Sequence, residues 1–320
     1  MKRILLVAVA LLTVAVAPAQ AAPVSTVSVL AFNIYQLPRI ADGDTAAKER
    51  RAKEAEAVIR AADADVVILS EAFSAEAESL RGRLADRWPA QTPLVGQYCS
   101  TSAGWNSVNG NCSNSLVVVN GGVTVLSKYA ITAKHQLVYR NSFWPTADYY
   151  SNKGAALVRV VKDGRAVWVA GTHLQADQTP LSIATSHDVR MAQLGELRAL
   201  VDKYAPASEP VIVGGDLNVE YWAGRSRVDS AGRNQVQQAS AALGGPIVGG
   251  SVQGFTYDGA TNPIAAANGG AAYRDVLDYI GTTRGSSSTR PLASVGTGRT
   301  LGFGSALPSD HYPVLATVGF

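Results

Sequence analysis

The sequence predicts an α/β fold in which two β-sheets pack face to face beneath outer helices. Strand-like apolar segments occur in both halves of the 320-residue chain, and segments with helical periodicity lie between them. No internal repeat of roughly 20 to 50 residues is present. Sheets and helices each have one apolar face, and stacking them in layers buries these faces against one another. No segment has the composition of an interdomain linker, so we expect one domain over residues 23–320.

The first part of the chain alternates between strands and helices. The segment VSVLAFNIY (27–35) is typical of a strand. A helix is expected over 44–62, with Asp44 as its N-cap and apolar residues at helical spacing. The segment VVILSEAF (66–73) indicates a second, buried strand, and a charged helix is expected over about 74–88.

The middle of the chain is rich in predicted β-structure. The turn signals NGG and KDG separate short apolar runs. A second long helix is expected over about 182–204. The expected strands are SLVVVN (115–120), VTVLSK (123–128), QLVYR (136–140), GAALVRVV (154–161) and AVWVAGTHL (166–174).

The last third of the chain returns to a mixed pattern. The strand PVIVGGDLN (210–218) precedes a helix that we expect near 226–243. Two further strands are expected at RDVLDYIG (274–281) and HYPVLATVG (311–319). Residues 281–306 are rich in Gly, Ser and Thr and contain few apolar anchors, so we expect a long mobile loop there.

The N-terminus has the features of a secretory signal peptide. Lys2 and Arg3 precede the apolar run ILLVAVALLTVAVA, and small residues of the A-x-A type follow it. We expect residues 1–22 to be removed. A membrane-anchoring helix is the alternative, but the run is short for a span and no stop-transfer pattern follows it. We therefore expect a secreted, extracellular protein.

The charge balance gives little support for a dedicated nucleic-acid binder. The chain has 28 Lys and Arg against 25 Asp and Glu, and loss of Lys2 and Arg3 reduces the basic excess to one. Nucleic-acid binders usually have a larger basic excess, although a local basic patch is compatible with a nearly neutral sum. We expect no stable nucleic-acid partner.

Cys99 and Cys112 enclose a short loop rich in Ser, Asn and Gly. In an exported protein these two cysteines are expected to form a disulfide. Such a bond would stabilise the fold by roughly 3 kcal/mol through the unfolded state. A zinc site is the alternative, but two thiols without a nearby histidine supply too few ligands.

Several of the expected strands end or begin with polar residues that are able to take part in catalysis. One such residue alone is often only a capped strand end, but six strands share the pattern. If these positions converge, they bring together carboxylates, amides and two imidazoles. That set suits a hard cation such as Mg²⁺ and the proton transfers of phosphodiester hydrolysis. The residues are Asn33, Glu71, His173, Asp216 with Asn218, Asp278, and Asp310 with His311.

The motifs FNIY, LSEAF, SNKG, GTHLQ, GGDLN, LDYI and SDHYPV, in this order, resemble those of the endonuclease/exonuclease/phosphatase superfamily. GDLN and SDH are specific to the superfamily, whereas SEAF, SNKG and THLQ point to its secreted bacterial neutral sphingomyelinases. The matches extend from about residue 27 to the last strand. The resemblance implies a four-layer α/β/β/α sandwich of two packed mixed β-sheets flanked by helices. It also implies Mg²⁺ as cofactor, with Mn²⁺ or Co²⁺ as alternative ions.

The resemblance implies a metal site and a phosphate contact. Glu71 matches the magnesium-binding glutamate of the family, with Asn33 beside it in support. Asp310 stands next to the family's general base and is expected at the metal site. Lys153, in SNKG, is expected to contact the phosphate.

The resemblance also implies the groups that move protons. His311 matches the general base that activates water, and Asp278 matches the acid that orients it. Asp216 and Asn218 match the pair that positions the nucleophilic water and the phosphate. His173 matches a second histidine, which protonates the leaving group or stabilises the charge on it.

The chain departs from the sphingomyelinase pattern in three places. Ala75 stands where an amide holds a second, edge-bound metal in some of these enzymes, so we expect no such edge site. Residues 281–306 offer only Phe303 where the family carries a hairpin with exposed aromatic side chains. The spacing between the two cysteines is also short.

The aromatic segment SFWPTADYYSNKG has two interpretations. Its aromatic residues belong either to ordinary loop and core packing or to a pocket for a quaternary ammonium head group, in which Trp144, Tyr149 or Tyr150 binds by cation–π attraction. His135 and His187 match no motif and are expected to be exposed or hydrogen-bonded to local groups.

The sequence leads to three candidate functions. The first is a Mg²⁺-dependent phospholipase C that hydrolyses sphingomyelin to ceramide and phosphocholine, acting as a monomer with peripheral contact to a membrane surface. The second is a secreted nuclease of the same superfamily, or a phospholipase C with another head-group preference. The third is a non-catalytic lipid or receptor binder, which the intact set of acids and histidines argues against.

Overall fold

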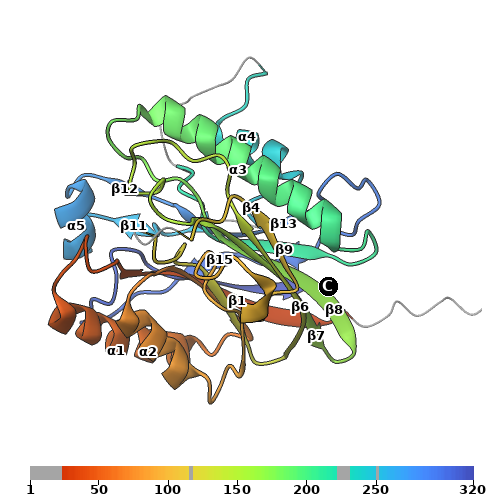
Figure 1. Ribbon diagram of the computed structural model, residues 1–320, viewed down its shortest axis with the longest axis horizontal. Coiled ribbons are helices and arrows are strands. Elements are labelled where there is room, and N and C mark those ends of the chain that lie inside the picture. The colour runs from red at the N-terminus through yellow and green to blue at the C-terminus, as the bar shows by residue number, and fades with distance from the viewer. Residues whose placement is uncertain (1–23, 115–117, 222–230, 250–251) are drawn as a thin grey trace, which may run out of the picture.

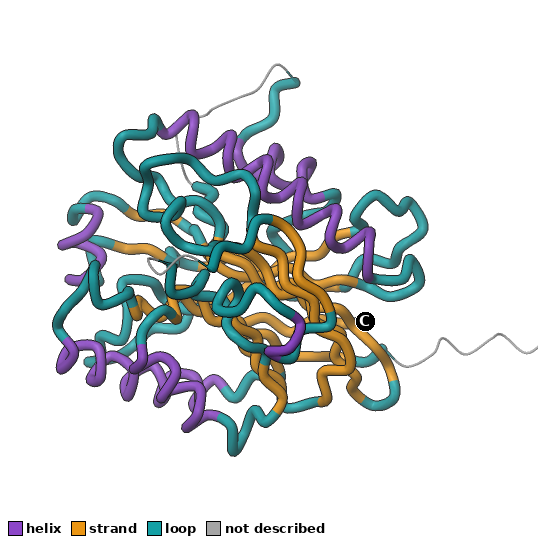
Figure 2. Tube along the Cα trace, viewed as in Figure 1, coloured by secondary structure: helices purple, strands orange, loops and turns teal. Residues whose placement is uncertain are grey.

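Two mixed β-sheets lie face to face at the centre of the molecule, and helices cover the outer face of each sheet (Figures 1 and 2). The computed structural model describes residues 24–114, 118–221, 231–249 and 252–320. The predicted signal peptide lies outside these residues. The four-layer α/β/β/α sandwich expected from the sequence is confirmed.

The first sheet is built around the central strands β1 and β2. These strands run parallel to each other, whereas β16 runs antiparallel to β1 on its other side. The strand order is β10 (Val252–Gln253), β15 (Gly298–Thr300), β16 (Val314–Gly319), β1 (Thr26–Gln36), β2 (Val66–Ala72), β5 (Thr124–Ser127) and β3 (Ala90–Gln91), and β14 (Ser294–Val295) also pairs with β16.

The second sheet contains one parallel pair of long strands, β8 and β9, and antiparallel neighbours on both sides of them. Its order is β13 (Asp278–Thr283), β9 (Val211–Asp216), β8 (Arg165–His173), β7 (Gly154–Lys162), β6 (Ala130–Val138) and β4 (Ser107–Gly110). A separate two-stranded sheet consists of β11 (Tyr257–Asp258) and β12 (Arg274–Asp275).

The helices lie on opposite outer sides of the sandwich, α1 and α2 on one side and α3 and α4 on the other (Figure 1). Asp44 caps α1 as expected, because its carboxylate accepts a hydrogen bond from the Ala47 N–H at 2.9 Å. The helices are α1 (Thr45–Ala62), α2 (Ala75–Leu84), α3 (Ile183–Tyr204), α4 (Gln235–Leu243) and α5 (Pro263–Gly269), and a short 3₁₀ turn covers Thr101–Ala103.

The apolar cores follow the two-residue period of the strands. On β1, Val27 and Val29 point to the interface between the two sheets, where they join the core that contains Val158 of β7. Leu30 and Phe32 of the same strand point the other way, into the core beneath α1 and α2. A third core lies between the second sheet and α3 and α4. Both faces of the central strands are therefore buried, which explains their continuous apolar sequences.

Several predicted elements differ from the structure at their boundaries. Residues 118–120 of the expected strand SLVVVN are irregular, and residues 115–117 lie outside the described part of the chain. The helix expected over 74–88 ends at Leu84. The helix expected near 226–243 starts at Gln235, because Asn234 and Gln237 form a capping box there; residues 226–230 are not described.

The expected single strand over 274–281 is two strands in the structure. Residues 274–275 pair with β11 in the small sheet, and residues 278–283 pair with β9 in the second sheet. Between them, Asp275 accepts a hydrogen bond from the Val276 N–H at 2.7 Å, which marks the change of direction. The strand at the C-terminus begins at Val314 rather than at His311, whose backbone makes only an isolated bridge to Tyr257.

The prediction of a long mobile loop over 281–306 is wrong. Strands β14 and β15 lie within this segment and pair with β16. Arg290 is buried, and its guanidinium donates to the carbonyls of Ala205, Pro206, Glu209 and Arg284. Hydrogen bonds from one arginine to these four carbonyls thus take the place of apolar anchors, and three of the four bonds hold the segment to the loop before β9.

The predicted disulfide between Cys99 and Cys112 is present, with the two Cα atoms 5.5 Å apart. Within the part of the chain that the structure describes, no helix is both long enough and apolar enough to cross a membrane.

Candidate active site

Three neighbouring strands of the second sheet bring charged side chains to one place. His173 at the end of β8 pairs in register with Asp216 at the end of β9, and Asp216 pairs with Asp278 at the start of β13. All three side chains are buried. Because residues directly opposite each other on adjacent strands point to the same face, the register places the three side chains side by side.

The first sheet contributes Asn33 from β1 and Glu71 from β2. A bulge interrupts the pairing of these strands after Asn33. Glu71 has a left-handed φ of 55°, a conformation that costs a residue with a side chain about 1–2 kcal/mol. Bulges and strained residues of this kind redirect side chains at functional sites. Here Glu71 lines the cavity that also contains Asp216 and His311.

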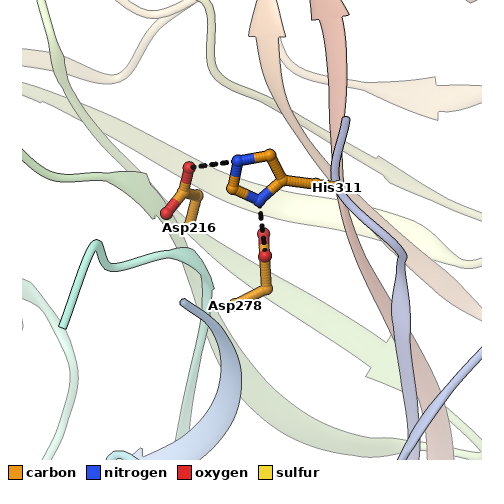
Figure 3. Close-up of side chains that lie close together, drawn as sticks. All are labelled: Asp216, Asp278 and His311. Carbon is orange, nitrogen blue, oxygen red and sulfur yellow. Dashed lines mark hydrogen bonds and ion pairs between the residues drawn. The ribbon is translucent and has the colours of Figure 1, made fainter. Parts of the chain in front are cut away.

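His311 lies between two carboxylates (Figure 3). Its Nδ1 is 2.8 Å from Asp278 Oδ2, and its Nε2 is 3.9 Å from Asp216 Oδ2. The edge of the Tyr257 ring contacts the imidazole, with the ring centroids 5.1 Å apart. The backbone N–H of His311 donates to Ser309 Oγ at 3.1 Å. The imidazole is therefore held in one orientation.

The carboxylates control the protonation of His311. Burial opposes the charged imidazole, but Asp278 and Asp216 outweigh burial and hold the pKa of His311 well above its ordinary value. Burial also raises the pKa of Asp278 to about 6, against the opposing effect of the nearby His311. At neutral pH the pair therefore keeps a proton on His311 Nδ1, which donates to Asp278.

Asp216 is the central acceptor of the site. Asn33 Nδ2 donates to Asp216 Oδ2 at 2.9 Å, and the Asn218 N–H donates to Asp216 Oδ1 at 3.0 Å. His173 Nε2 lies 3.4 Å from Asp216 Oδ2. Burial favours the neutral acid, but the positive charge on His311, the hydrogen bond from Asn33 and the charge of Lys153 prevail and lower the pKa of Asp216. Asp216 is therefore ionised, and it contacts Asn33 of the first sheet and His173 of the second.

Lys153 lies next to the second histidine. Its Nζ is 3.0 Å from His173 Nε2 and donates to the Leu174 carbonyl at 3.1 Å. Asp148 balances the buried ammonium, with its Oδ1 2.8 Å from Lys153 Nζ. Burial and the charge of Lys153 lower the pKa of His173 to about 4. His173 is thus neutral near pH 7, beside a fixed positive charge.

Glu71 and Asp310 form a place suited to a cation. Burial and the charge of Asp310 raise the pKa of Glu71 to about 8, and Glu71 Oε2 is a buried atom with no hydrogen-bond partner among the described residues. A buried carboxylate oxygen without a donor is costly. A divalent cation would satisfy it and offset the repulsion from Asp310. Asn33 is less available, because its Oδ1 accepts from the Tyr35 N–H and its Nδ2 donates to Asp216.

A second group of residues also has the geometry of a metal site. One ligand atom from each of Asp216, Asp278 and His311 lies within 4.8 Å of the others. However, the closest atoms of Asp278 and His311 are already bonded to each other, so an ion placed there would displace that hydrogen bond. Mg²⁺ prefers oxygen ligands. The unsatisfied oxygen of Glu71 beside Asp310 therefore fits Mg²⁺ better.

Two cavities meet at Glu71 and His173. The larger, of about 750 Å³, also contains Asp216, Asn218 and His311. The smaller, of about 350 Å³, contains Lys153 and Tyr150 and is lined mainly by apolar atoms. The residues expected to act together therefore gather at one place, with a polar cavity on one side and an apolar cavity on the other.

The three aromatic residues expected at a head-group pocket do not occupy equivalent positions. Tyr150 lines the smaller cavity, whereas Tyr149 and Trp144 line neither of the two cavities that contain Glu71. Tyr149 instead packs edge to face against Tyr150, with centroids 5.4 Å apart, and Trp144 is 64% exposed. Of the three, Tyr150 is therefore the one that lines a cavity beside the site, and a head-group pocket formed by these residues stays a prediction.

Three further residues contact the site but were not singled out from the sequence. Asp148 holds Lys153, as described above, and Asn268 Nδ2 donates to Asp310 Oδ2 at 2.9 Å. Thr256 Oγ1 accepts from the backbone N–H of Asp278 at 3.1 Å. All three lie in segments without a periodic pattern. The short helix α5, which carries Asn268, had a usable signal: Asn262 as N-cap followed by proline at the first helical position.

The two remaining histidines lie away from the site. His135 stacks on Tyr204 with centroids 3.8 Å apart, and its Nδ1 is 2.8 Å from Ser107 Oγ. His187 Nε2 is 2.9 Å from Gln238 Oε1. Both are hydrogen-bonded to local groups, one of the two outcomes expected from the sequence.

Comparison with known proteins identifies the family. The model of the Endonuclease/Exonuclease/phosphatase family matches residues 30–311. Sphingomyelinase C of Listeria ivanovii is 34% identical over 218 residues, which cover 68% of this chain and 61% of that protein. The matched region thus spans less than two thirds of the length of this relative.

Solved structures agree with this match. The structure of sphingomyelinase C from Streptomyces griseocarneus has a TM-score of 0.76 at 30% identity and covers 92% of this chain and 99% of its own. A mutant of beta toxin from Staphylococcus aureus with bound magnesium ions has a TM-score of 0.75 at 27% identity, covering 91% and 99%. The chain therefore belongs to the endonuclease/exonuclease/phosphatase family, in which these similar proteins are bacterial sphingomyelinases and beta toxin.

Proposed function

We propose that this protein is a secreted, Mg²⁺-dependent phosphodiesterase of the phospholipase C type, which hydrolyses sphingomyelin to ceramide and phosphocholine. The observation that carries the proposal is the position of His311 between Asp278 and Asp216, in the cavity that Glu71 also lines. The similarity to sphingomyelinases C supports the choice of substrate. We further propose that the protein acts as a monomer with peripheral membrane contact.

The attack on phosphorus begins with the proton of a water molecule. His311 in its neutral form accepts this proton at Nε2, while Asp278 keeps the Nδ1–H oriented at 2.8 Å. The water oxygen then bonds to phosphorus as the bond from phosphorus to the ceramide oxygen breaks. Asp216 and the Asn218 amide lie beside this path and orient the water and the phosphate.

Glu71 and Asp310 would hold the Mg²⁺ ion, with Asn33 nearby in support. When bound, the ion supplies positive charge that polarises the phosphoryl oxygens and favours the neutral form of His311. Mn²⁺ and Co²⁺ are further ions that this oxygen-rich pair would accept.

The leaving alkoxide of ceramide needs a proton. His173 is neutral in the resting site because of burial and Lys153. A phosphodiester anion next to it opposes this effect and favours the protonated imidazole. His173 then donates the proton to the leaving oxygen, and Lys153, 3.0 Å away, offsets the charge on the phosphate.

The experiment that tests the proposal offers three substrates in parallel with Mg²⁺: sphingomyelin, phosphatidylcholine and plasmid DNA. We expect release of phosphocholine from sphingomyelin, its loss in EDTA and its return with added Mg²⁺. The His311→Ala variant should fold and release none. Cleavage of plasmid DNA with no release of phosphocholine from either lipid would instead support the nuclease, and preference for phosphatidylcholine would change the lipid class.

A further inference from the structure

Exposed apolar side chains gather around the mouth of the smaller cavity. Ile40 is 93% exposed and Val119 is 56% exposed, and both line this cavity together with Tyr150. Phe143, Trp144 and Tyr149 are also exposed and lie on the 140–151 loop that carries Tyr150. We call these six side chains the apolar rim: Ile40, Val119, Phe143, Trp144, Tyr149 and Tyr150. Large exposed apolar groups that cluster in this way mark an interaction surface.

The exposed charged residues within the segments of the apolar rim are both positive, whereas Asp42 follows the first segment and Glu196 accepts hydrogen bonds from the Arg140 and Asn141 N–H groups of the third. The three described segments that form it, residues 37–41, 118–121 and 140–151, carry two exposed charged residues, Arg39 and Arg140. Their one carboxylate, that of Asp148, is buried and paired with Lys153. The rim therefore combines apolar side chains with guanidinium groups and presents no exposed carboxylate. This combination suits a surface of phosphate groups above hydrocarbon.

The 140–151 loop is fixed at its base, which keeps its exposed tip in place. Asp148 Oδ2 accepts from the Ala176 N–H at 2.8 Å, and Gln178 Nε2 donates to Asp148 Oδ1 at 3.1 Å. The same carboxylate holds Lys153 next to His173. A partner bound by the rim is thus held at a defined position relative to the site.

The segment before the SDH motif offers no comparable surface. Phe303 packs on Phe32 and Tyr312, with ring centroids 5.9 Å and 4.7 Å away. Its aromatic ring is therefore half-buried against the core on the side of α1. Hydrogen bonds from Arg290 hold the rest of this segment to the loop before β9, which lies at the end of that strand away from Asp216.

From these observations we propose that the apolar rim is the surface by which the protein docks onto a lipid bilayer with phosphocholine head groups. The inference rests on the proposed function, because the cavity inside the rim has Glu71, Lys153 and His173 in its wall. A lipid that stays anchored in the bilayer below the rim can present its phosphate to these residues. The rim thus joins bilayer contact to the place where the phosphodiester is hydrolysed.

The test measures binding separately from hydrolysis. Mature chains (residues 23–320) that also carry His311→Ala are mixed with vesicles of sphingomyelin and phosphatidylcholine, and the partition coefficient is measured by sedimentation. The rim variant is Ile40→Asn with Val119→Asn. The matched control is Val24→Asn with Leu292→Asn, since these side chains are also exposed but lie outside the rim. Turnover is measured for the same substitutions in chains with native His311, on vesicle sphingomyelin and on p-nitrophenyl phosphorylcholine, a soluble phosphodiester. The corresponding His311→Ala chains serve as the blank.

We expect the rim variant to lose at least about tenfold in partitioning, because two aliphatic side chains no longer leave water. Its hydrolysis of vesicle sphingomyelin should fall in proportion, while turnover of the soluble phosphodiester stays within about twofold of wild type. The control should match wild type in all three measurements. Unchanged partitioning of the rim variant, or an equal loss in the control, would overturn the proposal.

A second copy of the chain is the competing occupant of the rim. Light scattering without lipid distinguishes it: a wild-type dimer that becomes a monomer in the rim variant would overturn bilayer docking. Failure of the proposed function has a different signature. In that case the wild type releases no phosphocholine from any substrate, and the vesicle-binding result, obtained without turnover, still decides the role of the rim.

Discussion

His311 and Asp278 form a buried pair, with Nδ1 and Oδ2 2.8 Å apart, that joins the segment before β16 to the first residue of β13. His311 lies in the connection that leads into β16 of the first sheet, whereas Asp278 lies on β13 of the second sheet. The pair therefore depends on the packing of the two sheets against each other.

Replacing Asp278 with Asn should leave the ring of His311 without its charged acceptor. We expect kcat on sphingomyelin to fall by about 10²- to 10⁴-fold with little change in KM, because the loss affects proton transfer rather than binding. The pKa of His311 should also fall, since Asp278 raises it. Steady-state kinetics across pH measures both effects. Asp177→Asn, in the same cavity but paired with Arg190, is the control and should remain active.

Replacing Glu71 with Gln should weaken Mg²⁺ binding at least about tenfold, because one charged oxygen ligand is removed. Isothermal titration calorimetry with MgCl₂ measures the affinity directly, without substrate. Glu220→Gln is the matched control: this carboxylate lines the same cavity but already accepts from Tyr273 at 3.0 Å. If both variants bind Mg²⁺ as the wild type does, Glu71 is not a ligand.

Replacing Lys153 with Met should raise the pKa of His173 from about 4 toward its ordinary value, because the charge of Lys153 is one of the two main causes of the depression. NMR titration of the imidazole signals measures this shift. The value of kcat/KM should fall in the same variant, since the phosphate loses a fixed positive charge. An unchanged pKa would leave burial as the sole cause.

His135 should make the stability of the fold depend on pH. Burial, followed by the charge of Lys203, lowers the pKa of this imidazole from 6.5. Just below pH 6.5 the unfolded chain therefore binds a proton that the folded chain does not, so the free energy of unfolding decreases as the pH falls. His135→Phe keeps a ring on Tyr204 but cannot titrate. Urea unfolding at pH 8 and 5.5 should show a smaller loss for this variant, and equal losses would contradict the prediction.

Tyr150 should contribute to the recognition of choline. Tyr150→Ala is expected to raise KM for choline lipids by about 3- to 30-fold and to spare ethanolamine lipids, if the ring binds a quaternary ammonium group by cation–π attraction. Tyr149→Ala removes only the ring that packs against Tyr150, because Tyr149 does not line the cavity. An equal rise in KM for both lipid classes would rule out selective recognition of choline.

Much of the fold follows from local patterns in the sequence. The two-residue alternation on β1, with Val29 on one face and Leu30 on the other, required a strand covered on both sides. Asp44 marked the start of α1 through its own hydrogen bond to the helix N-terminus. The site residues were visible because they follow or begin apolar strands. This pattern alone left open whether they meet, and the resemblance to the superfamily implied that they do.

Other features depend on contacts that no local pattern contains. The interior position of Arg290 arises from carbonyls more than 80 residues away in the chain, in the loop before β9. Asp148 looks like an ordinary loop residue until the fold places it beside Lys153. Trp144 and Tyr150 have similar sequence surroundings, yet only the latter lines the cavity. Such differences are set by tertiary packing.

The side-by-side placement of His173, Asp216 and Asp278 has a consequence for how the family can change during evolution. A slip of one residue in any of these three strands would turn its acid or imidazole to the opposite face of the sheet. Single-residue insertions and deletions inside β8, β9 or β13 should thus be lethal to catalysis even where the domain still folds. Length variation among active homologues is accordingly expected in the connections between these strands.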